Sequence, residues 1–256
     1  MTAERRGFGS WARRGLRAGI VFVGAYLLIA YLILPRFWEE LDKKDDVDHA
    51  SPTESAPGFA YNDEGGRAGP INVELVGDRE QLIRALVAAG WRPAEPITFE
   101  SSVAIVKSVV FDRPDPTAPV SNLYLFDRKQ ALAFEREVGS SADRRHHNRW
   151  WLNDMADSVG RPIWYGAASM DARAGLSRRT GQVTHLISPD LDSERDFLME
   201  SLQRAGRLER QYEVMGVGPI QDGHNAEGSR YHTDGMRSVG VLVADSARED
   251  AAAPPE

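Results

Sequence analysis

The chain of 256 residues contains no cysteine. Disulfides, thiolate zinc sites, iron–sulfur ligation and cysteine nucleophiles are therefore excluded, and any metal would need His, Asp or Glu ligands. The sequence also has no P-loop, HExxH pair, Rossmann glycine pattern or Ser-His-Asp elbow. The net charge of −7 argues against a nucleic-acid partner. The common catalytic signatures thus give no direct route to a function, and no cofactor is identified.

Charge is unevenly distributed at the N-terminal end. Residues 1–17 carry five Arg and one Glu, whereas residues 36–70 carry four basic and nine acidic groups. Between them, residues 18–35 hold no charge and would form a helix of roughly 27 Å, about one bilayer core. This pattern predicts one transmembrane helix. The positive-inside rule places residues 1–17 in the cytoplasm and the residues after Trp38 outside a bacterial inner membrane.

Residues 36–70 are acidic and rich in Pro, Gly and Ser, so composition predicts a flexible tether. The tail 244–256 has the same character and is expected to be disordered. The globular domain is accordingly predicted to span residues 71–243.

Two similar units, each a strand followed by a helix, are expected inside this domain. In the first, a strand at 71–76 precedes a capping box, Asp78-x-x-Gln81, and a helix that ends at Gly90. In the second, a strand at 182–187 precedes a capping box, Ser193-x-x-Asp196, and a helix. Further strands are predicted at 120–126, 131–138, 145–151, 162–169, 211–215 and 236–243, whereas 99–110 fits either a helix or a strand. The fold class is therefore α+β, a mixed and mainly antiparallel sheet with two or three packing helices, preceded by one transmembrane helix.

Several segments resemble one known family. PTAPVSNLYLF, LAFEREVG, RRHHNRWW, GLSRRTGQVTH and PDLDSERDFL occur in an order similar to that of the LssY C-terminal domain. The resemblance implies a bacterial envelope domain named after a gene linked to type I secretion, and it implies no established reaction. Related longer proteins join this domain to DedA or type-2 phosphatidic acid phosphatase modules, in whose place this chain has one apolar segment.

The segment 144–149 concentrates imidazole and guanidinium groups. Strand alternation would place His146 and His147 on opposite faces. We expect Arg145, His146 and Arg149 to bind an anionic ligand and His147 to act on it. The alternative is that these charges protect a strand from aggregation.

A second polar segment, 175–185, combines hydroxyls, arginines and glycines beside a predicted strand. Ser177, Arg178, Arg179 and Thr180 are expected to bind a phosphate or carboxylate, with His185 as a second catalytic imidazole. The alternative is an ordinary hairpin turn, because 27 of the 31 basic residues are arginine and any one pair carries little information.

The acidic series from Asp190 to Asp196 does not match an EF-hand loop, and capping of a helix is its expected role. Asp190 is nevertheless assigned as the carboxylate that would orient a catalytic imidazole. No metal site is predicted. Residues 215–234, rich in glycine, are expected to form an exposed mobile loop.

Two functions remain open at this point. The first is a membrane-anchored domain outside the cytoplasm that binds an envelope protein or an anionic small molecule or lipid, with a role in secretion. The second is a hydrolase of a phosphate-bearing envelope substrate, with His147 or His185 as nucleophile or base, Arg178 and Arg179 as clamps, and Asp190 as orienter.

Overall fold

A computed structural model describes residues 5–34, 36–37, 57–94, 121–139, 141–178, 181 and 183–244. In chain order the elements are α1 (Arg5–Leu28), η1 (Ile29–Ile33, a π-helical turn), β1 (Phe59–Tyr61), β2 (Arg67–Pro70), β3 (Val73–Val76), α3 (Arg79–Ala88), β4 (Arg92–Pro93), β5 (Tyr124–Leu125), β6 (Arg128–Lys129), β7 (Leu132–Val138), β8 (Ser141–Ala156), β9 (Pro162–Leu176), β10 (Val183–Ile187), α5 (Leu191–Arg204), β11 (Leu208–Met215), β12 (Ile220–His224), β13 (Arg230–Thr233) and β14 (Met236–Leu242). The predicted α+β class is confirmed.

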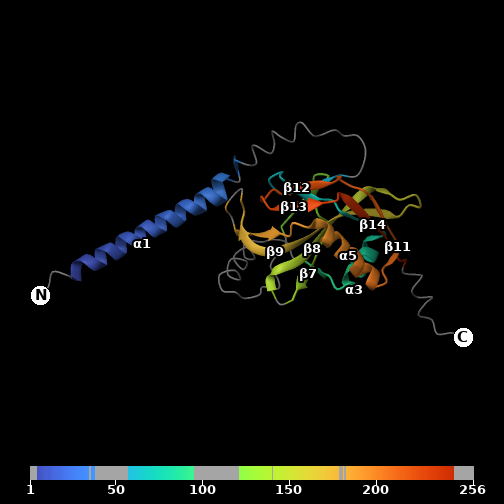
Figure 1. Ribbon diagram of the computed structural model, residues 1–256, viewed down its shortest axis with the longest axis horizontal. Helices are drawn as coiled ribbons and strands as arrows, with labels where there is room; N and C mark the ends of the chain where they lie inside the picture. The colour runs from blue at the N-terminus through green and yellow to red at the C-terminus, as the bar shows by residue number, and fades with distance from the viewer. Residues whose placement is uncertain are drawn as a thin grey trace.

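The N-terminal helix projects away from the rest of the molecule (Figure 1). Its segment Arg13–Ile33 has 21 residues and a mean hydropathy of 2.1, and almost all of it is exposed. A soluble helix would direct such a surface toward a core, whereas here almost all the apolar side chains except Ala30 are open to the surroundings. This helix is long and apolar enough to span a membrane.

The main sheet is built around one long antiparallel hairpin, β8–β9. The strand order is β11-β14-β3-β9-β8-β7-β4, with β10 on the same side of β9 as β3. Only the β14–β3 pair is parallel. A second sheet, β2-β1-β5-β6, and a separate hairpin, β12–β13, complete the described architecture. The expected mixed and mainly antiparallel sheet is therefore confirmed.

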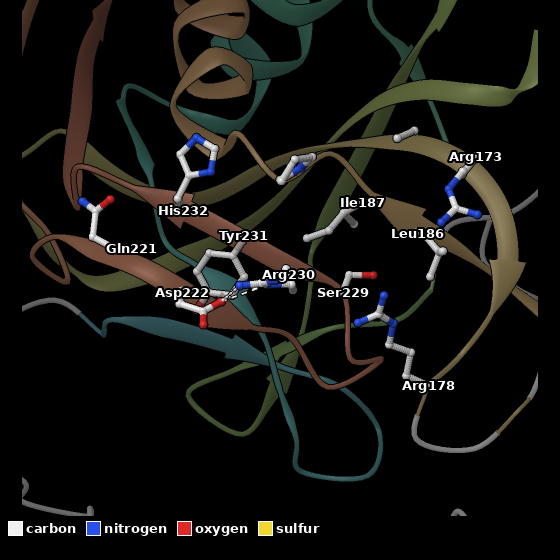
Figure 2. Close-up of a pocket in the computed structure, with 12 residues that line it drawn as sticks. Arg173, Arg178, Leu186, Ile187, Gln221, Asp222, Ser229, Arg230, Tyr231 and His232 are labelled. Atoms are coloured by element: carbon white, nitrogen blue, oxygen red, sulfur yellow. Dashed lines mark hydrogen bonds and ion pairs between the residues drawn. The ribbon is translucent and has the colours of Figure 1, made fainter.

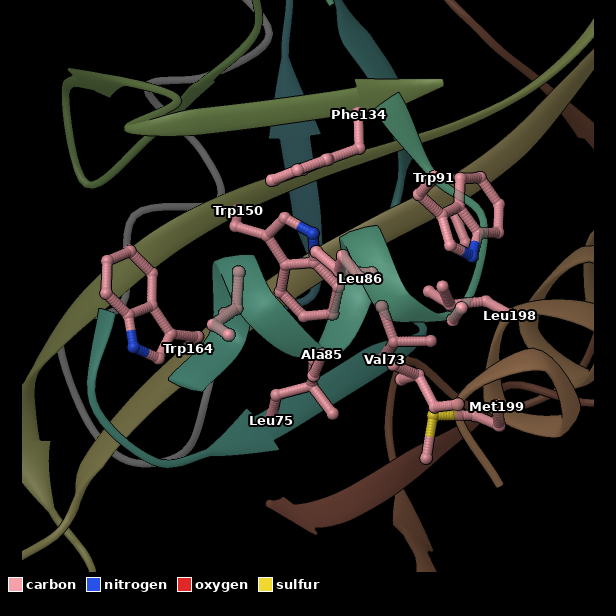
Figure 3. Close-up of a cluster of buried hydrophobic side chains, with 14 of the residues drawn as sticks. Val73, Leu75, Ala85, Leu86, Trp91, Phe134, Trp150, Trp164, Leu198 and Met199 are labelled. Carbon is pink, nitrogen blue, oxygen red and sulfur yellow. The ribbon is translucent and has the colours of Figure 1, made fainter. Parts of the chain in front are cut away.

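Both faces of the β8–β9 hairpin are covered. Trp150 and Trp164 belong to the core formed with α3 and α5, where Leu86 and Leu198 are fully buried (Figure 3). Trp151, the next residue along β8, belongs to a second buried cluster with residues of β1 and β5. Because neighbouring strand residues point to opposite faces, two successive tryptophans can contribute to both cores.

The two helix starts differ in how well sequence predicts them. Asp78 and Gln81 form the predicted capping box of α3. The box predicted at Ser193 is wrong, since α5 begins two residues earlier and its N-cap is Asp190. The Ser193 amide donates to the Asp190 carboxylate at 3.1 Å, so Ser193 is the third residue of the helix and not its cap.

Two segments expected to lack regular structure contain strands. Residues 59–61 and 67–70, assigned above to the tether, form the antiparallel pair β1–β2, and β1 also pairs with β5. Residues 220–233, assigned to a mobile loop, form the β12–β13 hairpin. These strands are short, and they are stabilised by contacts with distant parts of the chain that no local pattern reveals. The possible element at 99–110 and the tail after Ala244 lie outside the described residues.

Candidate functional site

A β-bulge in β9 determines which side chains meet beside β10. His185 pairs with Ala174, Leu186 with Arg173, and Ile187 with Asp171, so β9 has one extra residue, Ala172. Without this extra residue, Asp171 and Arg173, two positions apart, would share one face of β9. The bulge therefore turns Asp171 to the face of His185 and leaves Arg173 on the opposite face with Leu186.

The first face carries a group that we call the Asp171 cluster, formed by Asp171, Arg145, His147, Arg149 and His185. His147 Nε2 lies 2.6 Å from Asp171 Oδ2, and His185 Nδ1 lies 3.8 Å from the same oxygen. Because both ring nitrogens approach the same oxygen, the imidazoles of His147 and His185 lie close together. The two imidazoles singled out from the sequence lie beside one carboxylate that the sequence did not indicate.

The protonation of this cluster follows from burial. Burial lowers the pKa of His147, and the two nearby arginines add to this effect against the attraction of Asp171. Burial raises the pKa of Asp171, but His147, His185 and Arg145 outweigh it and hold this pKa below its ordinary value. A neutral His147 then donates its Nε2 proton to Asp171. Its buried Nδ1 is left as an acceptor with no hydrogen-bond partner among the described residues.

The arginines of the cluster are engaged by protein groups. Arg145 is fully buried and pairs with Glu135 at 2.8 Å, and Arg92 bonds the same carboxylate at 3.0 Å. Arg149 donates from Nε to the Ser121 carbonyl at 3.1 Å. Burial lowers the pKa of Arg149 to about 10, and the charge of Asp171 opposes the shift. Among the buried groups, Asp171 and the neighbouring Glu135 match Arg145 and Arg149 in number, whereas Arg92 is more exposed and also pairs with Glu137.

His146 lies on the other face of the sheet, as strand alternation predicts. Its Nδ1 is 2.6 Å from Glu194 Oε2, and its ring stacks on Phe197 with centroids 4.0 Å apart. Both partners belong to α5. These contacts give His146 a place in the packing of helix on sheet.

The acidic series at the start of α5 connects this helix to β13. Asp190 accepts hydrogen bonds from the amide and hydroxyl of Ser193. Asp192 accepts from the Thr233 hydroxyl at 2.6 Å, and Arg195 bonds Asp234 at 2.7 Å. Asp190 is expected from the sequence to orient His147 or His185, but the imidazole nearest to its carboxylate among the described residues is that of His232, with Nε2 4.0 Å from Oδ1. The structure, within its described ranges, contains no group of three or more residues suited to hold a metal.

The second face of β9–β10 borders a cavity of about 480 Å³, which we call the arginine cavity. The β12–β13 hairpin forms its other wall (Figure 2). Its lining residues are Ala172, Arg173, Arg178, Leu186, Ile187, Pro189, Gln221, Asp222, Ser229, Arg230, Tyr231 and His232. Arg230 bonds Asp222 through two nitrogens, at 3.0 and 2.8 Å. With three arginines and one carboxylate, the lining has an excess of positive charge.

Arg178 is held in this wall by a built turn. Its backbone amide donates to the Glu227 carbonyl at 3.0 Å. Gly228 adopts a φ of +77°, and a Cβ there would lie 2.7 Å from the Arg178 Cβ. The next residue, Ser229, is 7% exposed, and its hydroxyl has no hydrogen-bond partner in the part of the chain that is described. The cavity therefore combines an arginine whose backbone is fixed with a buried hydroxyl that has no partner among the described residues.

The residues predicted from the second polar segment separate in the structure. Arg178 lines the arginine cavity, and His185 lies in the Asp171 cluster. Ser177 is buried, and its carbonyl accepts from the Gly181 amide at 2.9 Å within the hairpin turn. Arg179 and Thr180 lie outside the described residues. Sequence reasoning missed Asp171, Arg173, Arg230 and His232, because a bulge and a distant hairpin bring them to these sites.

Comparison with known families is consistent with the resemblance of the sequence segments. A family model described as LssY C-terminus matches residues 53–236. The match begins before β1 and extends to the first residue of β14, so it covers both the Asp171 cluster and the arginine cavity. No curated protein and no solved structure matches the chain. The chain belongs to the LssY C-terminus family.

Proposed function

We propose that this protein is a membrane-anchored envelope domain that binds an anionic ligand in the arginine cavity. The observation that carries the proposal is the composition of the lining, which has three arginines and one carboxylate. Arg230 is engaged by Asp222, whereas no ion pair with another described residue engages the guanidinium of Arg173 or Arg178. These two groups are the ones available to a ligand.

Guanidinium chemistry indicates the class of ligand. A planar guanidinium binds a phosphate or carboxylate through two parallel hydrogen bonds, and it stays charged at neutral pH. The Ser229 hydroxyl and the His232 imidazole add a donor and a titratable group to the same lining. A volume of about 480 Å³ is suited to a small molecule or a headgroup.

The charge pattern around the apolar helix supports an envelope location for this cavity. Basic residues before the apolar helix and acidic residues after it favour an N-terminus in the cytoplasm and a domain outside the inner membrane. An envelope location agrees with the link between the family name and type I secretion. Reporter enzymes fused after Ala244 test the topology: one that is active only outside the cytoplasm should be active, and cytoplasmic activity would contradict the proposal.

Calorimetry of the full chain in detergent, titrated with inorganic phosphate, tests binding. Arg178→Ala should weaken the affinity about tenfold or more, because it removes a charged hydrogen-bonding partner. Arg210→Ala on β11 is the matched control, since Arg210 is exposed and does not line the cavity. Equal affinities in the wild type and Arg178→Ala would refute the assignment.

A second candidate function, hydrolysis, depends on the Asp171 cluster. Its specific support is the pair of imidazoles on one carboxylate, with His147 Nδ1 as an acceptor. In this version Asp171 takes the orienting role assigned above to Asp190, and His147 accepts a proton from the nucleophile. Activity toward p-nitrophenyl phosphate tests it. A double variant, His147→Ala with His185→Ala, that keeps full activity would remove the candidate.

A further inference from the structure

The apolar helix contacts the globular domain through the β9–β10 hairpin. The Tyr26 hydroxyl donates to the Gly181 carbonyl at 2.6 Å, across 155 positions of sequence. Ala30 is 2% exposed, although its neighbours in η1 are open to the surroundings. A Cβ built on Gly181 would lie 3.8 Å from the Ala30 Cβ. The tip of the hairpin therefore lies against the helix.

The position of this contact sets the depth of the hairpin relative to a bilayer. Ala30 and Tyr26 precede Ile33, the last residue of the apolar segment, by three and seven residues. At 1.5 Å per residue they lie about 5 and 10 Å from its end. The headgroup region on each side of a bilayer is about 5–7 Å thick. Both residues lie within the apolar segment, so if α1 spans the membrane the hairpin meets the helix at the outer edge of the hydrocarbon core, directly below the headgroups that face the domain.

The composition of the hairpin suits that level. Leu176, the last residue of β9, is an apolar side chain that is 53% exposed. Arg178 follows it two residues later, and the Gly181 amide donates to the Ser177 carbonyl at 2.9 Å. An exposed leucine beside arginine matches the boundary between acyl chains and phosphates.

We propose that the ligand of the arginine cavity is the phosphate headgroup of an anionic phospholipid in the leaflet facing the domain. This proposal rests on the proposed function, and it adds the source of the phosphate. Arg173 and Arg178 bind the phosphate oxygens, and the Ser229 hydroxyl donates a further hydrogen bond. Leu186, Ile187 and Tyr231 give the same cavity an apolar wall for the glycerol portion.

The test uses the full chain, incorporated into mixed vesicles of phosphatidylglycerol and phosphatidylcholine and then extracted in mild detergent. Lipid that remains bound is quantified by mass spectrometry. In parallel, calorimetry measures binding of glycerol 3-phosphate, a soluble form of the same chemistry. The wild type should retain phosphatidylglycerol over phosphatidylcholine by about fivefold or more, and Arg178→Ala should lose this preference. Arg173→Gln repeats the test at a second position in case Arg178→Ala fails to fold.

A paired change in the helix tests the role of the contact. Ala30→Leu places a larger side chain against Gly181, whereas Ala18→Leu makes the same change at an exposed position of α1. Ala30→Leu should reduce lipid retention and leave the affinity for glycerol 3-phosphate unchanged, and Ala18→Leu should change neither.

The outcomes separate the two proposals. Binding of glycerol 3-phosphate that depends on Arg178, without a preference for phosphatidylglycerol, would refute the lipid inference and leave the proposed function in place. Failure to bind either ligand would overturn both. If Arg210→Ala and Arg178→Ala lose the same amount of bound lipid, the net charge of the protein would explain the loss. That result would also overturn the inference.

Discussion

The two faces of the β9–β10 hairpin carry charged groups in opposite states. The Asp171 cluster is buried, and its two arginines are matched by Asp171 and the neighbouring Glu135. The arginine cavity is open, and its arginines exceed its carboxylates. Removing charges from water is costly, so buried ones persist only when partners compensate them. The comparison indicates that the first group maintains the fold and the second remains available for a ligand.

The largest expected difference concerns the carboxylates of the two groups. Asp171→Asn should reduce the free energy of unfolding by about 3–5 kcal/mol, because it leaves buried cations without their counter-charge. Asp222→Asn should change it by about 1 kcal/mol or less, because the Arg230–Asp222 pair is exposed. Urea denaturation of both full-length variants, followed by tryptophan fluorescence, checks this. Similar losses of unfolding free energy in the two variants would contradict the distinction between the Asp171 cluster and the arginine cavity.

The pH dependence of folding should depend on His147. Its pKa is lowered in the folded protein, so the unfolded chain binds a proton first as the pH falls below about 6.5. The free energy of unfolding should then decline by as much as about 1.4 kcal/mol per pH unit, until the pH reaches the pKa of His147 in the folded protein. At a pH above both the folded and the unfolded pKa, His147 makes no contribution to the pH dependence. His147→Gln should flatten this slope in unfolding experiments between pH 7.5 and 5.5. An unchanged slope would show that His147 does not titrate as its burial requires.

A comparison of alanine variants at two glycines distinguishes the effect of backbone strain from the effect of contact with Arg178. Gly228 and Gly139 both have positive φ, but only a Cβ at Gly228 would meet a neighbour, Arg178. Both alanine variants should lose about 1 kcal/mol of stability from strain. Gly228→Ala should also weaken phosphate binding, which calorimetry measures, and Gly139→Ala should not. Unaffected binding in Gly228→Ala would argue against the turn as the support of Arg178.

The smallest expected effect is a gain of affinity. Asp222→Asn removes the only carboxylate of the described cavity lining and frees Arg230. Affinity for phosphate should rise by about threefold to tenfold, a modest change because the pair is exposed and screened by solvent. The gain should be larger at low salt. A loss of affinity would mean that Asp222 itself contacts the ligand.

Local patterns in the sequence predicted the elements better than the sites. The Asp78 capping box, the apolar helix and the opposite faces of His146 and His147 all follow from spacings of a few residues. Each of these features depends on neighbouring residues alone, so periodicity and capping rules suffice.

The composition of each site depends on long-range geometry. Asp171 joins His185 because one extra residue, Ala172, shifts the register of β9 against β10. Arg230 reaches the cavity because a glycine-rich stretch forms the β12–β13 hairpin, whose contacts include the Asp192–Thr233 hydrogen bond. No short-range pattern encodes either event, and the abundance of arginine conceals the few that line the cavity.

A crystal structure of the full chain with tungstate, an anomalously scattering analogue of phosphate, tests the central claim most directly. The account predicts a tungsten peak in the arginine cavity, within hydrogen-bond distance of Arg173 and Arg178, and none beside His147. A peak at the Asp171 cluster, with the arginine cavity empty, would contradict the account and move the site to the other face of the hairpin.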